Sequence, residues 1–129
     1  MPRIMIIDDD PRYLELLGFA LEGAGFETIA STDSSTSLEL AARSRPDLII
    51  SDVSMPHEDG FMLARDLRTD PRTRDIPLMF LSARGQTVDR HEGQLAGAVD
   101  YLTKPFSPRE LVAVVERVLS QRTAGGAGA

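Results

Sequence analysis

The sequence predicts an α/β domain built on a parallel β-sheet. Five short apolar runs recur along the chain, and such runs are typical of strands buried on both faces. Apolar residues at helical spacing follow each run, which indicates alternating strands and helices with right-handed crossovers. A length of 129 residues suits one domain with a substantial core.

The five expected strands differ in how continuous their apolar runs are. The first and third are continuous apolar runs, whereas the second is a weaker one because polar residues interrupt it. Strands are expected at 4–7, 26–30, 48–52, 76–81 and 99–102. Helices are expected from Pro11 to Gly25, around 38–42, at 61–67, at 88–96 and from Pro108 onward.

Capping residues mark several helix ends. Pro11 opens the first helix, beside the helix-start acid Asp10, and Gly25 ends that helix. The Ser/Thr-rich stretch 31–37 is expected to be a loop that caps the second helix. Ser107 and Glu110 have the spacing of a capping box around Pro108. The predicted domain covers 1–122, and the Gly/Ala-rich 123–129 is expected to be a flexible tail or the start of a linker.

Composition narrows the function classes. Apolar residues make up 42% of the chain, as in globular proteins. Without Cys there is neither a disulfide nor a thiolate metal site. A net charge of −6 argues against direct nucleic-acid binding. No apolar stretch has the length of a signal peptide or a membrane span, so we expect a cytoplasmic protein.

Polar residues follow four of the expected strands. Asp8 and Asp9 come after the first strand, Asp52 ends the third, Ser82 follows the fourth, and Lys104 follows the fifth. In such sheets ligands bind beyond the carboxyl ends of the strands. The four loops therefore bring these side chains to one rim.

The chemistry of this rim suits phosphoryl transfer. Three clustered carboxylates repel one another unless a cation joins them, and oxygen ligands favour a hard cation such as Mg²⁺. Asp52 is a candidate nucleophile that forms an aspartyl phosphate. Lys104, the one Lys beside thirteen Arg, and the Ser82 hydroxyl are candidate phosphoryl ligands.

Each of these residues also has a simpler interpretation when it is considered alone. Asp8 and Asp9 fit an exposed pair of helix-start acids, Ser82 a strand-end turn residue, and Lys104 a solvated loop charge. The functional interpretation depends on their joint positions at the ends of successive strands.

Four motifs occur in a fixed order. They are Ile-Met-Ile-Ile-Asp-Asp-Asp-Pro, Pro-Asp-Leu-Ile-Ile-Ser-Asp-Val-Ser-Met-Pro-His-Glu-Asp-Gly, Leu-Met-Phe-Leu-Ser-Ala and Gly-Ala-Val-Asp-Tyr-Leu-Thr-Lys-Pro-Phe. On these motifs the chain resembles the receiver domain of two-component response regulators, over about residues 3–121. The resemblance implies a doubly wound, flavodoxin-like three-layer (βα)5 sandwich with strand order 2-1-3-4-5.

The resemblance also implies roles for individual residues. Asp52 would accept a phosphoryl group from a histidine kinase or histidine phosphotransfer protein. Asp9, Asp52 and the backbone carbonyl of Ser54 would bind Mg²⁺ directly, and Asp8 would assist through water. Lys104 would hold the phosphoryl group. The only catalysis implied is the domain's own phosphorylation and slow autodephosphorylation.

A conformational switch is implied as well. Ser82 and Tyr101 would form the switch pair, and they would change the surface built from the helix at 88–96, the fifth strand and the last helix. That surface would control a partner protein, a homodimer or an effector domain outside this chain. Ser54 and Arg84 would flank the attacking water and tune hydrolysis.

Two other functions are alternatives, one because it shares the predicted chemistry and one because it shares the predicted topology. A Mg²⁺-dependent phosphohydrolase also forms an aspartyl phosphate, but it often carries a second Asp two residues after the nucleophile, where this chain has Ser54. A flavodoxin-like redox carrier would need a hydroxyl- and Gly-rich loop after the first strand, where this chain has three Asp residues.

Overall fold

A computed structural model of the chain describes residues 2–52, 60–82, 98–103 and 106–127. Within these ranges the side chains of residues 34, 60–61, 82, 98 and 122–127 are not described.

Five parallel strands form one sheet, in the order β2-β1-β3-β4-β5. The strands are β1 (Arg3–Ile7), β2 (Glu27–Ser31), β3 (Leu48–Asp52), β4 (Leu78–Ser82) and β5 (Ala98–Thr103). The described helices are α1 (Pro11–Gly23), α2 (Ser34–Ser44), α3 (Gly60–Thr69) and α5 (Pro108–Ala127). The predicted fold class and strand order are confirmed, whereas the helix expected at 88–96 lies outside the described residues.

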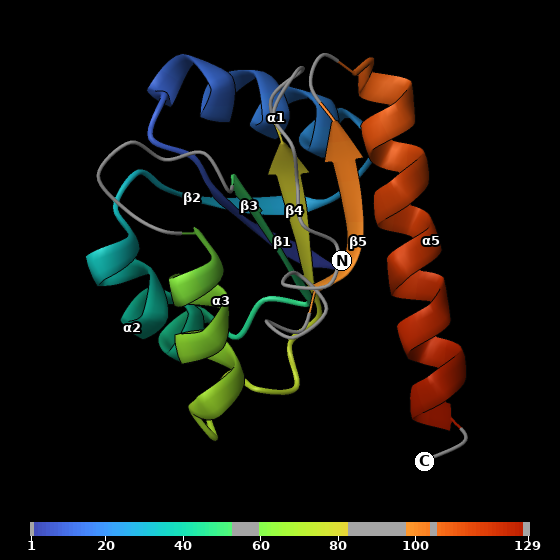
Figure 1. The fold of residues 1–129 in the computed structure, drawn as a ribbon. Helices are drawn as coiled ribbons and strands as arrows, with labels where there is room; N and C mark the ends of the chain where they lie inside the picture. The colour runs from blue at the N-terminus through green and yellow to red at the C-terminus, as the bar shows by residue number, and fades with distance from the viewer. Residues whose placement is uncertain (1, 53–59, 83–97, 104–105, 128–129) are drawn as a thin grey trace.

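The sheet separates two apolar layers, so the molecule has three layers (Figure 1). In β1, Ile4 and Ile6 face α1 and α5, while Met5 and Ile7 face α2 and α3. All four side chains are at most 1% exposed. Because alternate residues of a strand point to opposite faces, a strand covered on both sides must be apolar throughout, as the sequence pattern indicated.

Helix ends follow the predicted capping chemistry. The side chain of Asp10 accepts the Arg12 N–H at 3.0 Å and caps α1. Gly25, at φ +96°, closes the same helix, because that left-handed conformation lets the Phe26 N–H reach the Leu21 carbonyl at 3.1 Å.

The last helix begins with the predicted capping box. The Ser107 hydroxyl accepts the Glu110 N–H at 3.1 Å, and the Glu110 carboxylate accepts the Ser107 N–H at 3.2 Å. Two orphan N–H groups at the helix start are thereby satisfied.

Two helix boundaries differ from the expectation. Residues 34–37, expected in a capping loop, already belong to α2, because the carboxylate of Asp33 caps the helix by accepting the Ser35 N–H at 2.9 Å. At the other end, α5 continues to Ala127 and so occupies most of the segment expected to be a flexible tail. Ala is the strongest helix former and extends a helix that is already anchored by packing. The domain boundary at residue 122 stays a prediction.

Among the helices described here, none combines the length and the apolar character needed to cross a membrane.

Candidate functional site

Three carboxylates meet at the carboxyl edge of the sheet. Asp8 follows β1, Asp9 comes next in the chain, and Asp52 is the last residue of β3. One oxygen from each lies within 4.8 Å of the others. Asp8 is 1% exposed and Asp52 3% exposed, whereas Asp9 is open to solvent. The structure therefore brings together the carboxylates that the sequence assigned to one rim.

Strand pairing explains why these side chains converge. Strands β1 and β3 are parallel neighbours, and Ile7 lies opposite Ser51 in their register. The next residue on each strand is therefore an aspartate, Asp8 on one and Asp52 on the other. The cluster is a direct consequence of strand register, so shifting either strand by one residue would separate the two buried carboxylates.

The backbone of Asp8 is held by the neighbouring edge strand. Its N–H donates to the Ser31 carbonyl at 3.2 Å. The buried hydroxyl of Ser31 donates to the Asp33 carbonyl at 3.1 Å and shares a hydrogen bond of 2.9 Å with Ser37. This hydroxyl network ties the start of α2 to the acidic cluster and was not predicted from the sequence. The available signal was the pair of Ser residues at the end of β2 and in the first turns of α2.

Asp10 lies next to the cluster in sequence but has a different task. Its N–H donates to the Asp8 carboxylate at 3.0 Å, while its own carboxylate caps α1. Hydrogen bonds from Arg12, chiefly from its backbone N–H, lower the pKa of Asp10. The expectation that Asp10 is a helix-start acid and not a ligand of the cluster fits this arrangement.

The donor set fits a hard divalent cation. All three ligand atoms are carboxylate oxygens, which Mg²⁺ and Ca²⁺ prefer. A cation bound among them would also offset the repulsion between like charges in a largely buried site. The donor atoms present are thus suited to the predicted metal.

The remaining predicted site residues are only partly described. Ser82 ends β4 and lies one residue beyond Leu81, the register partner of Asp52, so its backbone reaches the same edge of the sheet. Lys104, Ser54 and Arg84 lie outside the described residues.

Tyr101 lies in β5, partly buried against the α2–α3 side of the sheet. Its ring centroid is 5.9 Å from that of Phe80, with the rings tilted by 47°. Its neighbour Asp100 pairs with Arg117 of α5 and accepts the Tyr101 N–H at 2.8 Å. The Tyr101 ring therefore packs beside β4, while the preceding residue of β5 is linked to α5.

The sequence matches the response regulator receiver domain over residues 4–116. The chain belongs to the family of response regulator receiver domains. This receiver domain is 46% identical over 123 residues to the DNA-binding dual master transcriptional regulator RpaA of Synechocystis, covering 95% of this chain and 51% of that protein.

Solved structures agree with this assignment. A putative response regulator from Chloroflexus aurantiacus is 37% identical, with a TM-score of 0.85 and coverage of 92% of this chain and 98% of that one. The receiver domain of the sensor histidine kinase PA1611 from Pseudomonas aeruginosa, 28% identical with a TM-score of 0.82 and the same coverage, carries a magnesium ion in its active site cleft. The chain spans about half the length of RpaA.

Proposed function

We propose that Asp52 is the phosphoacceptor of this receiver domain. The observation that carries the proposal is the acidic cluster: Asp52 ends a central strand, is 3% exposed, and lies within 4.8 Å of two further carboxylates. A carboxylate at this position is the nucleophile that aspartyl-phosphate chemistry requires. The family assignment favours this role over the phosphohydrolase and redox-carrier alternatives.

The proposed reaction is a direct phosphoryl transfer. A carboxylate oxygen of Asp52 attacks the phosphorus of a phosphohistidine on a histidine kinase or phosphotransfer protein. The new O–P bond forms while the P–N bond breaks, and the imidazole leaves with the electron pair. The product is an acyl phosphate on Asp52, which water later hydrolyses to return the free carboxylate. Positioning and charge neutralisation provide most of the catalysis in such transfers.

Charge neutralisation is assigned to residues on both sides of the acceptor. Asp9, Asp52 and the Ser54 backbone carbonyl would hold Mg²⁺, with Asp8 acting through water. Bound Mg²⁺ supplies positive charge next to the incoming phosphoryl oxygens. Lys104 would add a second cation at the end of β5, and the Ser82 hydroxyl would donate a hydrogen bond.

The conformational change that we propose to follow phosphorylation involves β5. When the Ser82 hydroxyl moves toward the phosphoryl group, the space that it leaves admits the Tyr101 ring, which already packs beside Phe80. The surface built from residues 88–96, β5 and α5 then changes, and Val99 contributes a 53% exposed apolar side chain to it. We propose that this surface controls a homodimer, a partner protein or an effector domain outside this chain. Ser54 and Arg84 would set how long the phosphorylated state lasts.

The name and length of the relative RpaA support one class of effector for this receiver domain. RpaA is named a DNA-binding regulator, and this chain spans about half of it. This supports an effector that binds DNA while the receiver domain itself does not, in keeping with a net charge of −6. We also keep the cytoplasmic location and the domain limits of 1–122 as proposals.

Intact-mass measurement tests the acceptor role. The protein is incubated with acetyl phosphate, with MgCl₂ or with EDTA. Wild type is expected to gain one phosphate-sized mass only with MgCl₂, Asp52→Ala to gain none, and the exposed-site control Asp66→Ala to behave as wild type. A gain that is equal in Asp52→Ala, or no gain in wild type, would contradict the proposal.

A further inference from the structure

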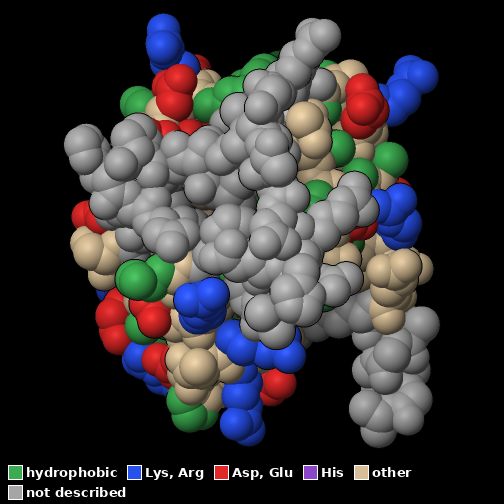
Figure 2. Space-filling view, viewed as in Figure 1, with side chains coloured by type: hydrophobic (Ala, Val, Ile, Leu, Met, Phe, Trp, Pro, Cys, Tyr) green, Lys and Arg blue, Asp and Glu red, His purple; other side chains and the backbone are tan. Residues whose placement is uncertain are grey.

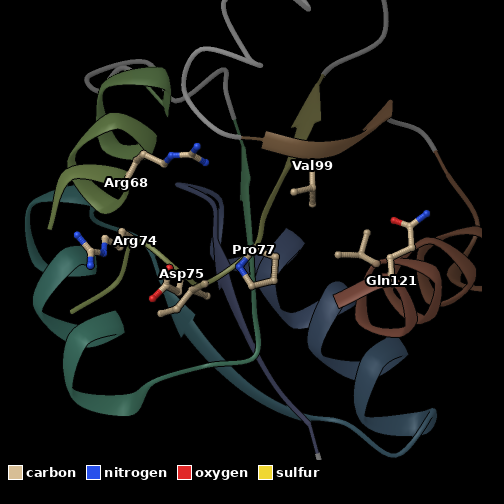
Figure 3. A pocket seen from close by; sticks show the side chains of 8 residues that line it. Arg68, Arg74, Asp75, Pro77, Val99 and Gln121 are labelled. Atoms are coloured by element: carbon tan, nitrogen blue, oxygen red, sulfur yellow. The ribbon is translucent and has the colours of Figure 1, made fainter. Parts of the chain in front are cut away.

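A cavity lies at the opposite edge of the sheet from the acidic cluster. Its volume is about 610 Å³. It opens where the amino ends of β4 and β5 pass between α3 and α5 (Figure 3). Its described lining includes Arg68, Ile76, Pro77, Val99, Val118 and Gln121. No step of the proposed phosphoryl transfer uses these residues.

One cation faces into this cavity. Arg68 belongs to the last turn of α3, and Figure 3 shows its guanidinium directed toward the middle of the cavity. The described residues give it no hydrogen bond or ion pair, in contrast to the arginines at 3, 12, 72 and 117, each of which pairs with a carboxylate. Arg68 therefore has donors available for an external anion.

The nearby charges leave this position positive. Arg74 and Asp75 line the cavity at one end, and the Arg74 side chain turns away from Val99 and Gln121 (Figure 3). Asp75 forms no ion pair with Arg68 in the described part of the chain. In the space-filling view, Lys and Arg side chains lie among Asp and Glu side chains on the lower part of the face (Figure 2). The described lining of the cavity thus holds two Arg and one Asp, a small positive excess on a protein of net charge −6.

The other walls are apolar. Val99 is 53% exposed, and Ile76 and Pro77 are partly exposed beside it. Apolar surface of this kind contributes binding energy when it is covered by a ligand. The Gln121 amide on α5 adds one neutral polar group at the rim.

We propose that this cavity binds an amphipathic organic anion, meaning a carboxylate, phosphate or sulfonate on an aromatic or aliphatic body. Arg68 holds the anionic group, and Ile76, Pro77 and Val99 cover the apolar body. A guanidinium with free donors beside an apolar wall is complementary to this class of ligand and to neither a cation nor a purely apolar molecule. The site is separate from the acidic cluster, and although Val99 also belongs to the proposed output surface, binding of the anion does not require phosphoryl transfer.

A pair of dyes tests the proposal. The first probe is 8-anilino-1-naphthalenesulfonate, and the second is N-phenyl-1-naphthylamine, which has the same aromatic body without the sulfonate. Fluorescence titrations use wild type, Arg68→Gln and the control Arg43→Gln, which removes an exposed Arg from the last turn of α2. Amide NMR spectra of the wild-type protein locate the sulfonate probe.

We expect Arg68→Gln to weaken binding of the sulfonate about two- to fivefold, as for an exposed charge pair, and to leave the neutral dye unchanged. Arg43→Gln should bind both dyes as wild type does. A second variant, Val99→Asp, should also weaken the sulfonate, because it places a like charge in the apolar wall. Amide shifts should centre on residues 68, 76, 99 and 118–121.

Three results would overturn the proposal. They are equal sulfonate affinity in Arg68→Gln and wild type, equal weakening of both dyes by Arg68→Gln, and amide shifts centred away from the cavity, for example around the exposed Phe19 of α1.

Discussion

Replacing Asp9 by Asn is expected to stabilise the protein when no divalent cation is present. Asp9 brings a third negative charge within 4.8 Å of the buried carboxylates of Asp8 and Asp52. Asn keeps the shape of the side chain and removes its charge. Asp9 itself is exposed, so the substitution opens no cavity in the core.

The size of the effect follows from Coulomb's law. Two unit charges separated by 4.8 Å repel by about 0.9 kcal/mol in bulk water and by about 3.5 kcal/mol at an effective dielectric constant of about 20. Because Asp9 is open to solvent, each of its two interactions lies near the lower figure. The free energy of unfolding should therefore rise by about 1–3 kcal/mol at low ionic strength.

Urea unfolding with EDTA and with MgCl₂ measures this effect. Wild type should gain stability from MgCl₂, by about 2.7 kcal/mol at a concentration of about 100 times the dissociation constant. The gain should be smaller in Asp9→Asn, which lacks the carboxylate that we propose binds the cation. The variant is thus the more stable protein in EDTA and the less responsive one to MgCl₂. Asp66→Asn, on the exposed side of α3, is the control and should stay within about 0.5 kcal/mol of wild type.

Two outcomes would refute this reasoning. If Asp9→Asn is no more stable than wild type in EDTA, the carboxylates do not repel as their positions require. If MgCl₂ stabilises both proteins equally, Asp9 is not a ligand of the cation.

Three further predictions concern other parts of the chain. Phosphorylation should change the NMR environment of the Tyr101 ring, and unchanged ring signals would contradict the proposed switch. Hydrogen bonds from Arg72 lower the pKa of Asp70 and of Glu39, so the stability that they add is present above the ordinary values of 3.8 and 4.5 and is lost as pH falls through the lowered values. Urea unfolding across this acid range should show a smaller loss in Arg72→Gln than in wild type, and parallel curves would count against the interaction. Ser107→Ala should cost about 1 kcal/mol in urea unfolding at neutral pH through loss of the α5 capping box, and a value near zero would show that the cap is dispensable.

Much of the acidic site could be predicted because it depends on topology. Parallel strands place their carboxyl ends at one edge, so carboxylates that directly follow β1 and end β3 must meet once these strands are neighbours. The helix caps at Asp10 and Ser107 could also be predicted, since capping depends on residues that are close in sequence.

Other features depend on contacts that the sequence does not specify locally. The Ser31 carbonyl meets Asp8 only because β2 pairs with β1, and a Ser at a strand end gives little indication of this. The place of Arg68 beside Ile76 and Val99 depends on where the end of α3 lies relative to the starts of β4 and β5. The end of α5 contains both Ala, which favours a helix, and Gly, which disfavours one. Composition alone therefore does not predict that the helix continues to Ala127.

The central claim is that the carboxylate of Asp52 receives the phosphoryl group. Reduction of the phosphorylated protein with borohydride converts an aspartyl phosphate to homoserine, and peptide mass mapping then identifies the modified position. We predict homoserine at position 52 and unmodified aspartate at positions 8 and 9. Homoserine at another aspartate, with Asp52 unchanged, would contradict the assignment of the acceptor.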